Sequence, residues 1–324
     1  MEMKREKPVK FALALGAGGA RGLAHLGVIE SLLDCGISID YVTGSSIGAI
    51  IGALYCHRGD LDQVRTHALE LINDPKMGKK WEVFAARKDQ SKNSRAGKVI
   101  EDIRIFINNQ YLKIAVVTKK SLAKQSDLMD PLKILFGDLT TADLKIPFSA
   151  CTVDLKSGKE LYLDQGKLTD IVYASSAIPG IFPPLERDGM LLADGSVTDL
   201  VPVEIARQQP DHSVIAVDFG PGQLFRGDYS KGVDIMMRAD ELARIKLNDI
   251  ILQNADVVIS PQVDDFHWAE FNEYENIIRL GREAVLEVRD QIEALRVIPV
   301  PTLTETPPKQ NWFAKLMGKL LGRG

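Results

Sequence analysis

The chain has 324 residues, of which 45% are hydrophobic and 26% are charged, close to the average for soluble globular proteins. This composition excludes disordered, collagen-like and disulfide-scaffold proteins, and no run approaches the roughly 18 apolar residues of a membrane-spanning helix. The formal net charge of −4 argues against a dedicated nucleic-acid binder. The length suits one large α/β domain or two smaller ones.

The first 60 residues alternate between strand and helix patterns. A short apolar run at 9–15 predicts a buried strand, and apolar residues spaced i, i+3, i+4 over 23–34 predict an amphipathic helix. A second strand at 40–43 leads through a glycine-rich turn into a helix that ends near residue 57. This order predicts parallel strands covered by helices.

The same alternation continues along the chain. Further strands are predicted at 147–153, 160–163, 190–193, 214–219 and 257–259. Further helices are predicted at 126–136, 168–176, 203–208, 234–253 and 275–295. We therefore expect the α/β fold class, with residues 1–298 as one three-layer α/β/α domain around a mostly parallel sheet.

Three cysteines, Cys35, Cys56 and Cys151, lie far apart in the sequence. Such a set fits neither a disulfide framework nor a zinc site, so we expect no metal and a reducing, cytoplasmic setting. Basic residues before the first strand resemble the start of a signal peptide. The apolar run that follows is short and Arg21 comes soon after it, so we expect no signal peptide.

The segment Gly44-Ser45-Ser46-Ile47-Gly48 fits the G-x-S-x-G pattern between a predicted strand and a predicted helix. A serine on such a sharp turn presents its hydroxyl in a strained backbone conformation that needs small neighbours, which Gly44 and Gly48 supply. Placing the motif on Ser45 fails because its flanking positions are not glycines. Ser46 is therefore the candidate nucleophile; the alternative is a Gly/Ser turn that only starts a helix.

A second glycine-rich turn, Gly16-Ala17-Gly18-Gly19-Ala20-Arg21-Gly22, also joins a strand to a helix. Free backbone N–H groups at a helix start form an anion site. A dinucleotide-binding turn would need glycine where Arg21 stands, so we favour an oxyanion hole beside the activated serine. The Arg21 side chain could hold an anionic part of a substrate or brace the turn.

A serine nucleophile needs a base. The chain has five histidines: His25, His57, His67, His212 and His267. Most of these histidines lie in polar turns or at helix surfaces. His25, the one nearest the glycine-rich turn, is better suited to support that turn than to act as the base. The remaining candidate is Asp194, at the C-terminal end of a predicted strand, where ligand sites of parallel sheets gather. A buried aspartate can accept the serine proton; the alternative is an Asp-Gly turn between strands.

Together these motifs resemble the patatin-like phospholipase family, specifically its bacterial cytoplasmic members. The resemblance spans about residues 9–295 and rests on four blocks in the family's order: 18–28, 44–48, 174–184 and 194–195. Position 196 is Ser, where many relatives have glycine or alanine. The resemblance implies a patatin-like fold and hydrolysis of acyl esters by a Ser–Asp dyad without histidine or cofactor.

The resemblance also implies a role for each matching residue. Ser46 would be the nucleophile and Asp194 its activator. The oxyanion hole would be formed by the loop Gly18, Gly19, Ala20, Arg21 and Gly22, with the backbone donors of Gly18 and Gly19 facing the oxyanion. The supporting residues would be Gly44, Gly48, His25 and Gly195.

Two basic segments interrupt an otherwise acidic chain. Residues 76–124, the basic segment, hold 13 basic and four acidic residues, and we interpret them as a cap-like insertion over the site. After a Pro-rich linker at 299–310, residues 311–324 form the tail, for which we predict a basic amphipathic helix. We expect these segments to contact anionic membranes; the alternative for the tail is docking on its own domain or on a second subunit.

The sequence thus predicts a cytoplasmic serine acylhydrolase whose substrate is a phospholipid or lysophospholipid ester, and its basic segments favour a peripheral position on the inner face of the membrane. Two alternatives stay open: a catalytically silent membrane-associated regulator or scaffold, and an acyltransferase that uses the same site. No nucleic-acid partner is expected, and a homo-oligomer is compatible with the sequence.

Overall fold

The computed structural model describes residues 9–72, 121–220, 232–267 and 270–296. The linker, the tail and all but the last four residues of the basic segment lie outside the described residues. The described strands are β1 (Lys10–Leu15), β2 (Ile39–Gly44), β3 (Phe148–Asp154), β4 (Lys159–Leu163), β5 (Leu185–Arg187), β6 (Met190–Asp194), β7 (His212–Val217) and β8 (Val257–Ile259).

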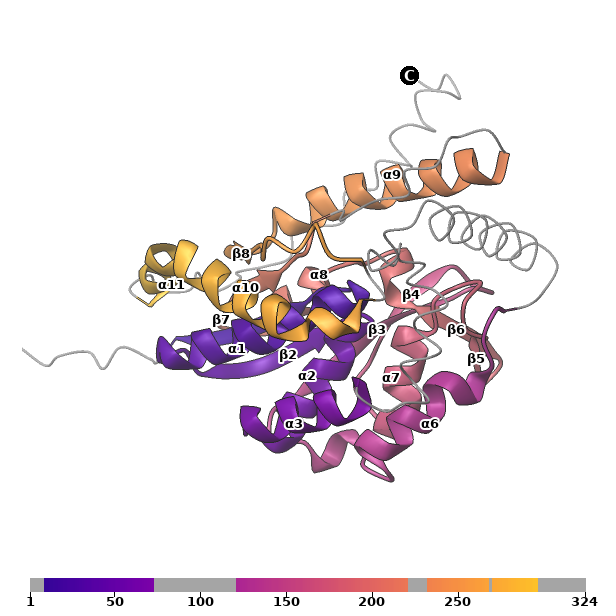
Figure 1. The fold of residues 1–324 in the computed structure, drawn as a ribbon, viewed down its shortest axis with the longest axis horizontal. Helices are drawn as coiled ribbons and strands as arrows, with labels where there is room; N and C mark the ends of the chain where they lie inside the picture. The colour runs from indigo at the N-terminus through magenta and orange to yellow at the C-terminus, as the bar shows by residue number, and fades with distance from the viewer. Residues whose placement is uncertain (1–8, 73–120, 221–231, 268–269, 297–324) are drawn as a thin grey trace, which may run out of the picture.

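These strands form one sheet in the order β5-β6-β3-β2-β1-β7-β8, with β4 paired to β3 in addition (Figure 1). The run from β3 to β8 is parallel throughout. The strands β4, β5 and β6 are antiparallel additions at one side of the sheet. The sheet is therefore parallel at its centre and mixed at one edge.

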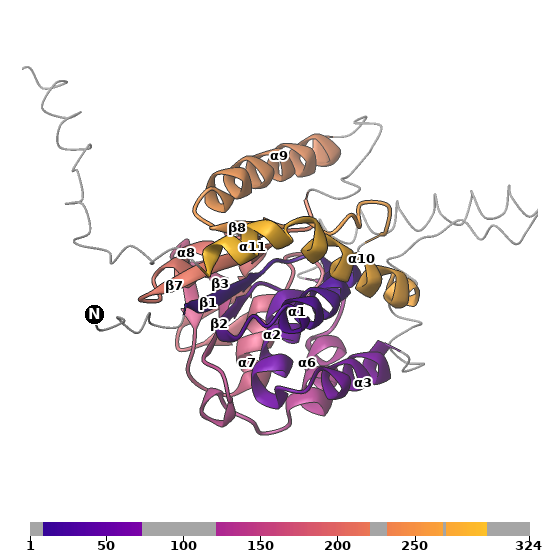
Figure 2. The ribbon, with the colours of Figure 1, turned by 90° about the vertical axis from the view of Figure 1, so that its left-hand side faces the viewer.

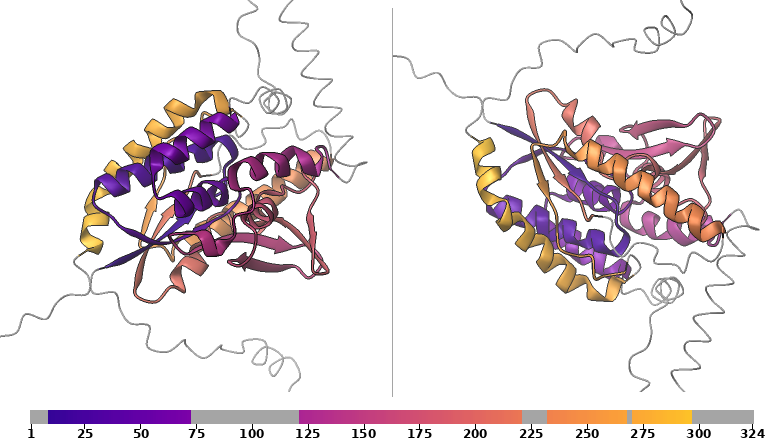
Figure 3. Two further views of the ribbon diagram at one scale, coloured as in Figure 1. Left: turned by 90° about the horizontal axis from the view of Figure 1, so that it is seen from below. Right: turned by 90° about the horizontal axis from the view of Figure 1, so that it is seen from above.

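Helices cover both faces of the sheet. The described α-helices are α1 (Ala24–Asp34), α2 (Ile47–Arg58), α3 (Leu61–Ile72), α6 (Gln125–Phe136), α7 (Leu168–Ser176), α8 (Val203–Arg207), α9 (Gly232–Leu252), α10 (Tyr274–Glu287) and α11 (Arg289–Leu295). The short 3₁₀ helices are η1 (Gly19–Leu23), η2 (Thr141–Asp143), η3 (Gly195–Val197) and η4 (Phe271–Glu273). Figures 2 and 3 show α8 and α9 on one side of the sheet and α1, α2, α6, α7 and α10 on the other.

Strand β1 shows how the sequence builds two cores. Phe11, Leu13 and Leu15 point into the larger core beneath α1, α2 and α7. Ala12 and Ala14 point to the other face, where α8 and the end of α9 pack closely on small side chains. Successive strand residues face opposite sides, so a continuous apolar run is what a strand buried on both faces requires. The predicted three-layer α/β class is confirmed.

The structure differs from the predicted elements in three places. Helix α3 (Leu61–Ile72) was not among the predicted helix ranges. The helix expected over 275–295 is two helices, because the backbone at Val288 (φ −109°, ψ 15°) leaves the helical conformation. Strand β5 was not predicted: three residues pair with β6 through a tight turn in which Asp188 and Gly189 both have positive φ. Among the described residues, no helix is both long and apolar enough to cross a membrane.

Candidate functional site

Ser46 lies on a strained turn between β2 and α2. Its φ of 54° and ψ of −120° are rare for a residue with a side chain. A methyl group on Gly44 would lie 2.4 Å from the backbone of Gly48, and one on Gly48 would lie 2.2 Å from the Leu15 carbonyl oxygen. The turn can form only because these two positions carry no side chain, as the G-x-S-x-G spacing requires.

Asp194 reaches Ser46 by an arrangement that the sequence did not predict. We expected its strand to end at the carboxyl edge of a parallel sheet, but β6 runs antiparallel to β3. Because β4 occupies the other edge of β3, β2 and β6 share one edge: Gly44 lies opposite Ala150, and Asp194 lies opposite Thr152. The two strands therefore run toward each other and end two residues apart along β3.

The C-terminal end of α7 holds both of these residues. The Ser46 N–H donates to the carbonyl oxygen and to the hydroxyl oxygen of Ser175, each at 3.1 Å. The Asp194 N–H donates to the Ala177 carbonyl oxygen at 3.1 Å. Only the family resemblance distinguishes the block 174–184 in the sequence, because its contacts with residues 46 and 194 have no local sequence signal.

The carboxyl group of Asp194 is fully buried. Its Oδ1 accepts a hydrogen bond from the Ser196 N–H at 2.9 Å. Burial raises the pKa of Asp194, while hydrogen bonding from Ser196 and from the Ser46 side chain acts in the opposite direction. Oδ2 has no hydrogen-bond partner among the described residues.

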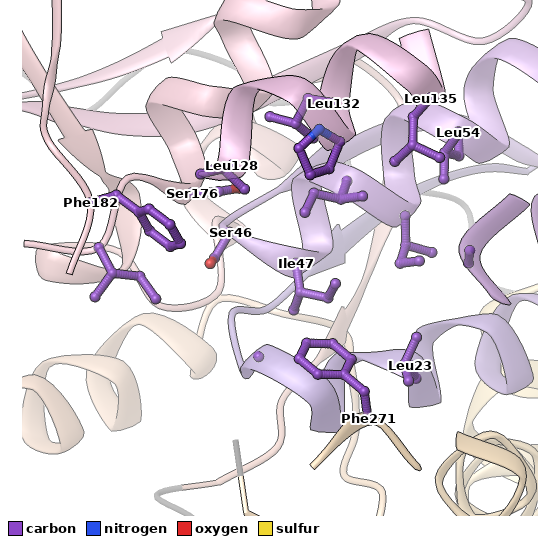
Figure 4. A pocket seen from close by; sticks show the side chains of 16 residues that line it. Leu23, Ser46, Ile47, Leu54, Leu128, Leu132, Leu135, Ser176, Phe182 and Phe271 are labelled. Carbon is purple, nitrogen blue, oxygen red and sulfur yellow. The ribbon is translucent and has the colours of Figure 1, made fainter. Parts of the chain in front are cut away.

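Ser46 opens onto an apolar cavity of about 100 Å³ (Figure 4). Figure 4 shows Ser46 between Phe182 and Phe271, with Leu54 and Leu135 toward the end away from Phe182. The cavity is lined by Gly19, Leu23, Ser46, Ile47, Ile50, Ile51, Leu54, Ala68, Leu128, Pro131, Leu132, Leu135, Ser176, Ile178, Phe182 and Phe271. Among the described residues, no charged side chain belongs to this lining, so it suits a hydrocarbon chain.

The glycine-rich loop borders the same cavity. The N–H groups of Gly16 and Ala17 donate to the carbonyl oxygens of Val217 and Leu200, which fixes the start of the loop. Gly18 and Gly19 follow at the start of η1, where backbone N–H groups have no acceptor within the helix. Gly19 lines the cavity together with Ser46. The buried residues Ala20 and Gly22 lie behind the cavity wall, Gly22 against Ile47.

His25 and Arg21 lie behind this loop and not in the cavity lining. His25 is fully buried, bonds through Nε2 to the Gly16 carbonyl oxygen at 2.8 Å and packs against the Phe219 ring. Burial lowers the pKa of His25 to about 4, so the ring is neutral. Arg21 donates to the Phe219 carbonyl oxygen at 3.4 Å and faces the carboxylates of Asp218 and Asp264. Both residues brace the loop in this structure.

None of the five histidines belongs to the described cavity lining. In the described part of the chain, Cys151, Glu160 and Asp199 bring a thiol and two carboxyl groups within 4.8 Å of one another. Burial raises the pKa of the Cys151 thiol well above its ordinary value, and the Tyr162 hydroxyl already lies between the two carboxyl groups. We therefore identify none of these residues as a metal ligand.

Known proteins are similar to this chain in sequence. The chain is 31% identical over 194 residues to an uncharacterized NTE family protein of Mycobacterium tuberculosis, covering 60% of this chain and 44% of the relative. It is 31% identical over 212 residues to patatin-like phospholipase domain-containing protein 7 of Rattus norvegicus, covering 65% of this chain and 14% of that protein. The match thus spans less than half the length of either relative.

Among solved structures, VipD from Legionella pneumophila is similar with a TM-score of 0.46 and 14% sequence identity, covering 88% of this chain and 67% of that chain. The sequence model of the patatin-like phospholipase family matches residues 13–207, which include the glycine-rich loop, the serine turn and Asp194. This match takes in more than half of the 324 residues. The chain therefore belongs to the patatin-like phospholipase family.

Proposed function

We propose that the protein is a serine acylhydrolase that cleaves carboxylic ester bonds of phospholipids or lysophospholipids. The observation that carries this proposal is the position of Ser46: its strained turn faces an apolar cavity, and the buried carboxyl group of Asp194 lies against it. A nucleophile beside a base, at the mouth of a space that accepts hydrocarbon, suits an ester with a long acyl chain.

In the first half of the reaction, Ser46 Oγ forms a bond with the carbonyl carbon of the ester. Asp194, whose pKa the Ser46 side chain already influences by hydrogen bonding, accepts the hydroxyl proton as this bond forms. The bond between the carbonyl carbon and the alcohol oxygen then breaks. The proton held by Asp194 passes to the leaving alcohol, and the acyl group stays on Ser46.

The negative charge that develops on the carbonyl oxygen needs fixed donors. The backbone N–H groups of Gly18 and Gly19 are suited to this role because they start η1 beside the cavity and have no acceptor within the helix. Removing one such donor from an oxyanion hole typically slows the reaction by about 100-fold to 1,000-fold.

In the second half, water attacks the acyl-enzyme. Asp194 takes a proton from this water and returns it to Ser46 Oγ as the acyl–serine bond breaks, which releases the fatty acid. An alcohol acceptor in place of water would make the same site an acyltransferase. The product released from the acyl-enzyme distinguishes the two outcomes.

The proposal is tested by Ser46→Ala, with Ser45→Ala as the matched control one residue away. We expect the wild-type chain and Ser45→Ala to release fatty acid from lysophospholipid and from short-chain esters. Ser46→Ala should lower kcat by more than about a thousandfold, because no other group can form the acyl-enzyme. Equal hydrolysis by wild type and Ser46→Ala would show that the proposal is wrong.

A further inference from the structure

The hydroxyl group of Tyr162 contacts two carboxyl groups at once. It lies 2.6 Å from Oε1 of Glu160 and 2.8 Å from Oδ2 of Asp199. A phenol has one proton and can donate only one hydrogen bond. Both short contacts can be hydrogen bonds only if one carboxyl group is protonated and donates to the phenol oxygen.

Asp199 is the carboxyl group that carries this proton. It is only 1% exposed, whereas Glu160 at the start of β4 is partly exposed. Burial, followed by the nearby charge of Glu160, raises the pKa of Asp199 to about 8, and burial also raises the pKa of Tyr162. The chain of donors at neutral pH therefore runs from Asp199 to Tyr162 to Glu160.

The protonated carboxyl group belongs to the turn that directly follows the candidate base. Asp199 closes the turn that begins at Asp194: its N–H donates to the Gly195 carbonyl oxygen at 2.8 Å. The turn packs tightly on β3, since a methyl group on Gly195 would lie 2.5 Å from the Cys151 carbonyl oxygen. The charges of Asp199 and Asp194 both raise the pKa of the Cys151 thiol, so the two carboxyl groups lie near the same side chain.

We propose that Asp199 is a positioning residue for Asp194: as a neutral acid held by Tyr162 it keeps the turn 195–199 in place, and its ionisation disturbs Asp194 and ends activity at alkaline pH. This inference rests on the proposed function, because it assigns regulation to the same site. It gives the site a second carboxyl group with a defined protonation state, in addition to that of Asp194.

The groups around Asp199 explain why its ionisation would be disruptive. Cys151 faces it from β3, Glu160 and Tyr162 from β4, and Glu204 from α8. The charges that act on its carboxyl group are thus acidic, and within the described part of the chain Oδ1 has no hydrogen-bond partner. A buried carboxylate without a cation or full hydrogen bonding is unfavourable, so the turn would rearrange to hydrate it.

Kinetics as a function of pH test the proposal. Asp199→Asn mimics the neutral acid, so we expect it to be active at pH 7 and to lack the alkaline decline that the wild type shows near the pKa of Asp199. Glu160→Gln removes a charge that raises this pKa, so its alkaline decline should move to lower pH. Asp138→Asn, at a side chain that is 98% exposed, is the matched control and should keep the wild-type profile.

Thermal unfolding gives a readout that does not depend on activity. The pKa of Asp199 is raised in the folded state, so its contribution to stability is fully present below its unfolded pKa and is lost as pH rises through about 8. The Tm of the wild type should therefore fall more steeply toward alkaline pH than the Tm of Asp199→Asn. If Asp199→Asn does not fold, the shift of the alkaline decline in activity to lower pH in Glu160→Gln is the remaining test.

Two results would overturn the inference: an unchanged alkaline limb in both variants, or equal dependence of Tm on pH in the wild type and Asp199→Asn. A wild-type chain without Ser46-dependent hydrolysis at any pH would instead refute the proposed function. In that case the Tm comparison still decides whether Asp199 is protonated in the folded protein.

Discussion

At Ser46 the backbone is held in a conformation that costs a residue with a side chain about 1–3 kcal/mol. Two contacts offset this strain: the Ser46 N–H donates to both oxygens of Ser175, and the turn packs on glycines that leave no room for a side chain. A strained backbone conformation persists where the surrounding structure enforces it. At Ser46 this conformation fixes the hydroxyl group at the mouth of the cavity.

Asp194 gives a prediction about pH. It must be ionised to accept the Ser46 proton, and burial raises its pKa, so the acid limb of kcat should lie above the ordinary aspartate value of 3.8. Asp194→Asn should abolish this acid limb and lower kcat by more than about a thousandfold. Kinetics of both chains from about pH 4 to about pH 8 measure the effect.

The same substitution should act on stability in the opposite direction. Because the folded pKa of Asp194 is raised, its contribution to stability is lost as pH rises through that pKa, and the neutral amide avoids this loss. We therefore expect Asp194→Asn to have a higher Tm than the wild type at pH 7. A chain that loses activity and stability together would indicate a structural role for Asp194.

Short sequence patterns were sufficient to identify some candidate residues and not others. Ser46 and Gly18 stand in contiguous motifs, so their chemistry could be predicted from neighbours in the chain. The bond from Ser46 to Ser175 joins residues 129 positions apart, and the protonation of Asp199 depends on burial beside Tyr162. Neither has a local pattern, so both required the three-dimensional structure.

At the scale of elements, the sequence predicted strands and helices well but not strand direction. Strand β6 is apolar like the parallel strands, and only its pairing with β3 shows that it runs the other way. Its antiparallel course is what brings the end of β6 opposite the end of β2. The sequence did not predict β5, because a strand of three residues is too short to show a periodic pattern. It did not predict the break at Val288 either, because one distorted residue does not interrupt the helical periodicity.

The cavity predicts a limit on acyl-chain length. Its lining follows α2 from Ile47 to Leu54, roughly 10 Å along the helix axis, and includes Ala68 of α3. A larger side chain at Ala68 should fill part of this cavity. Ala68→Phe should therefore move the preferred ester to shorter chains while kcat/KM for acetyl and butyryl esters stays within about threefold, a difference worth less than 1 kcal/mol.

A series of p-nitrophenyl esters of increasing chain length measures this preference. Ala243→Phe, at an exposed position of α9, is the matched control for the added ring and should leave the preference unchanged. The Tm of both variants checks for overpacking, which typically costs about 1–3 kcal/mol in a filled core. An unchanged chain-length profile in a folded Ala68→Phe protein would place the acyl chain elsewhere.

At the scale of the whole molecule, the net charge of −4 conceals an uneven distribution. The basic segment carries +9 and the stretch from the linker through the tail carries +3, which leaves −16 on the remaining residues. Each basic residue near an anionic membrane contributes about 1 kcal/mol to binding. The segments that would approach a lipid surface are thus the basic ones, and apart from residues 121–124 they lie outside the described residues.

This distribution predicts binding to anionic vesicles that depends on the tail. The full chain should co-sediment with vesicles of anionic phospholipid more strongly than with neutral ones, and added salt should weaken the binding. A chain shortened to end at Val300 should bind less. Undiminished binding of the shortened chain would remove the tail from this role and leave the basic segment as the contact.

Covalent trapping shows whether Ser46 is an activated nucleophile. A fluorophosphonate probe reacts with a serine whose hydroxyl is activated by a base, and peptide mapping then identifies the modified residue. We expect one label, on Ser46, that is absent from Ser46→Ala and retained in Ser45→Ala. A label on another residue, or no label on the folded wild-type chain, would contradict this expectation.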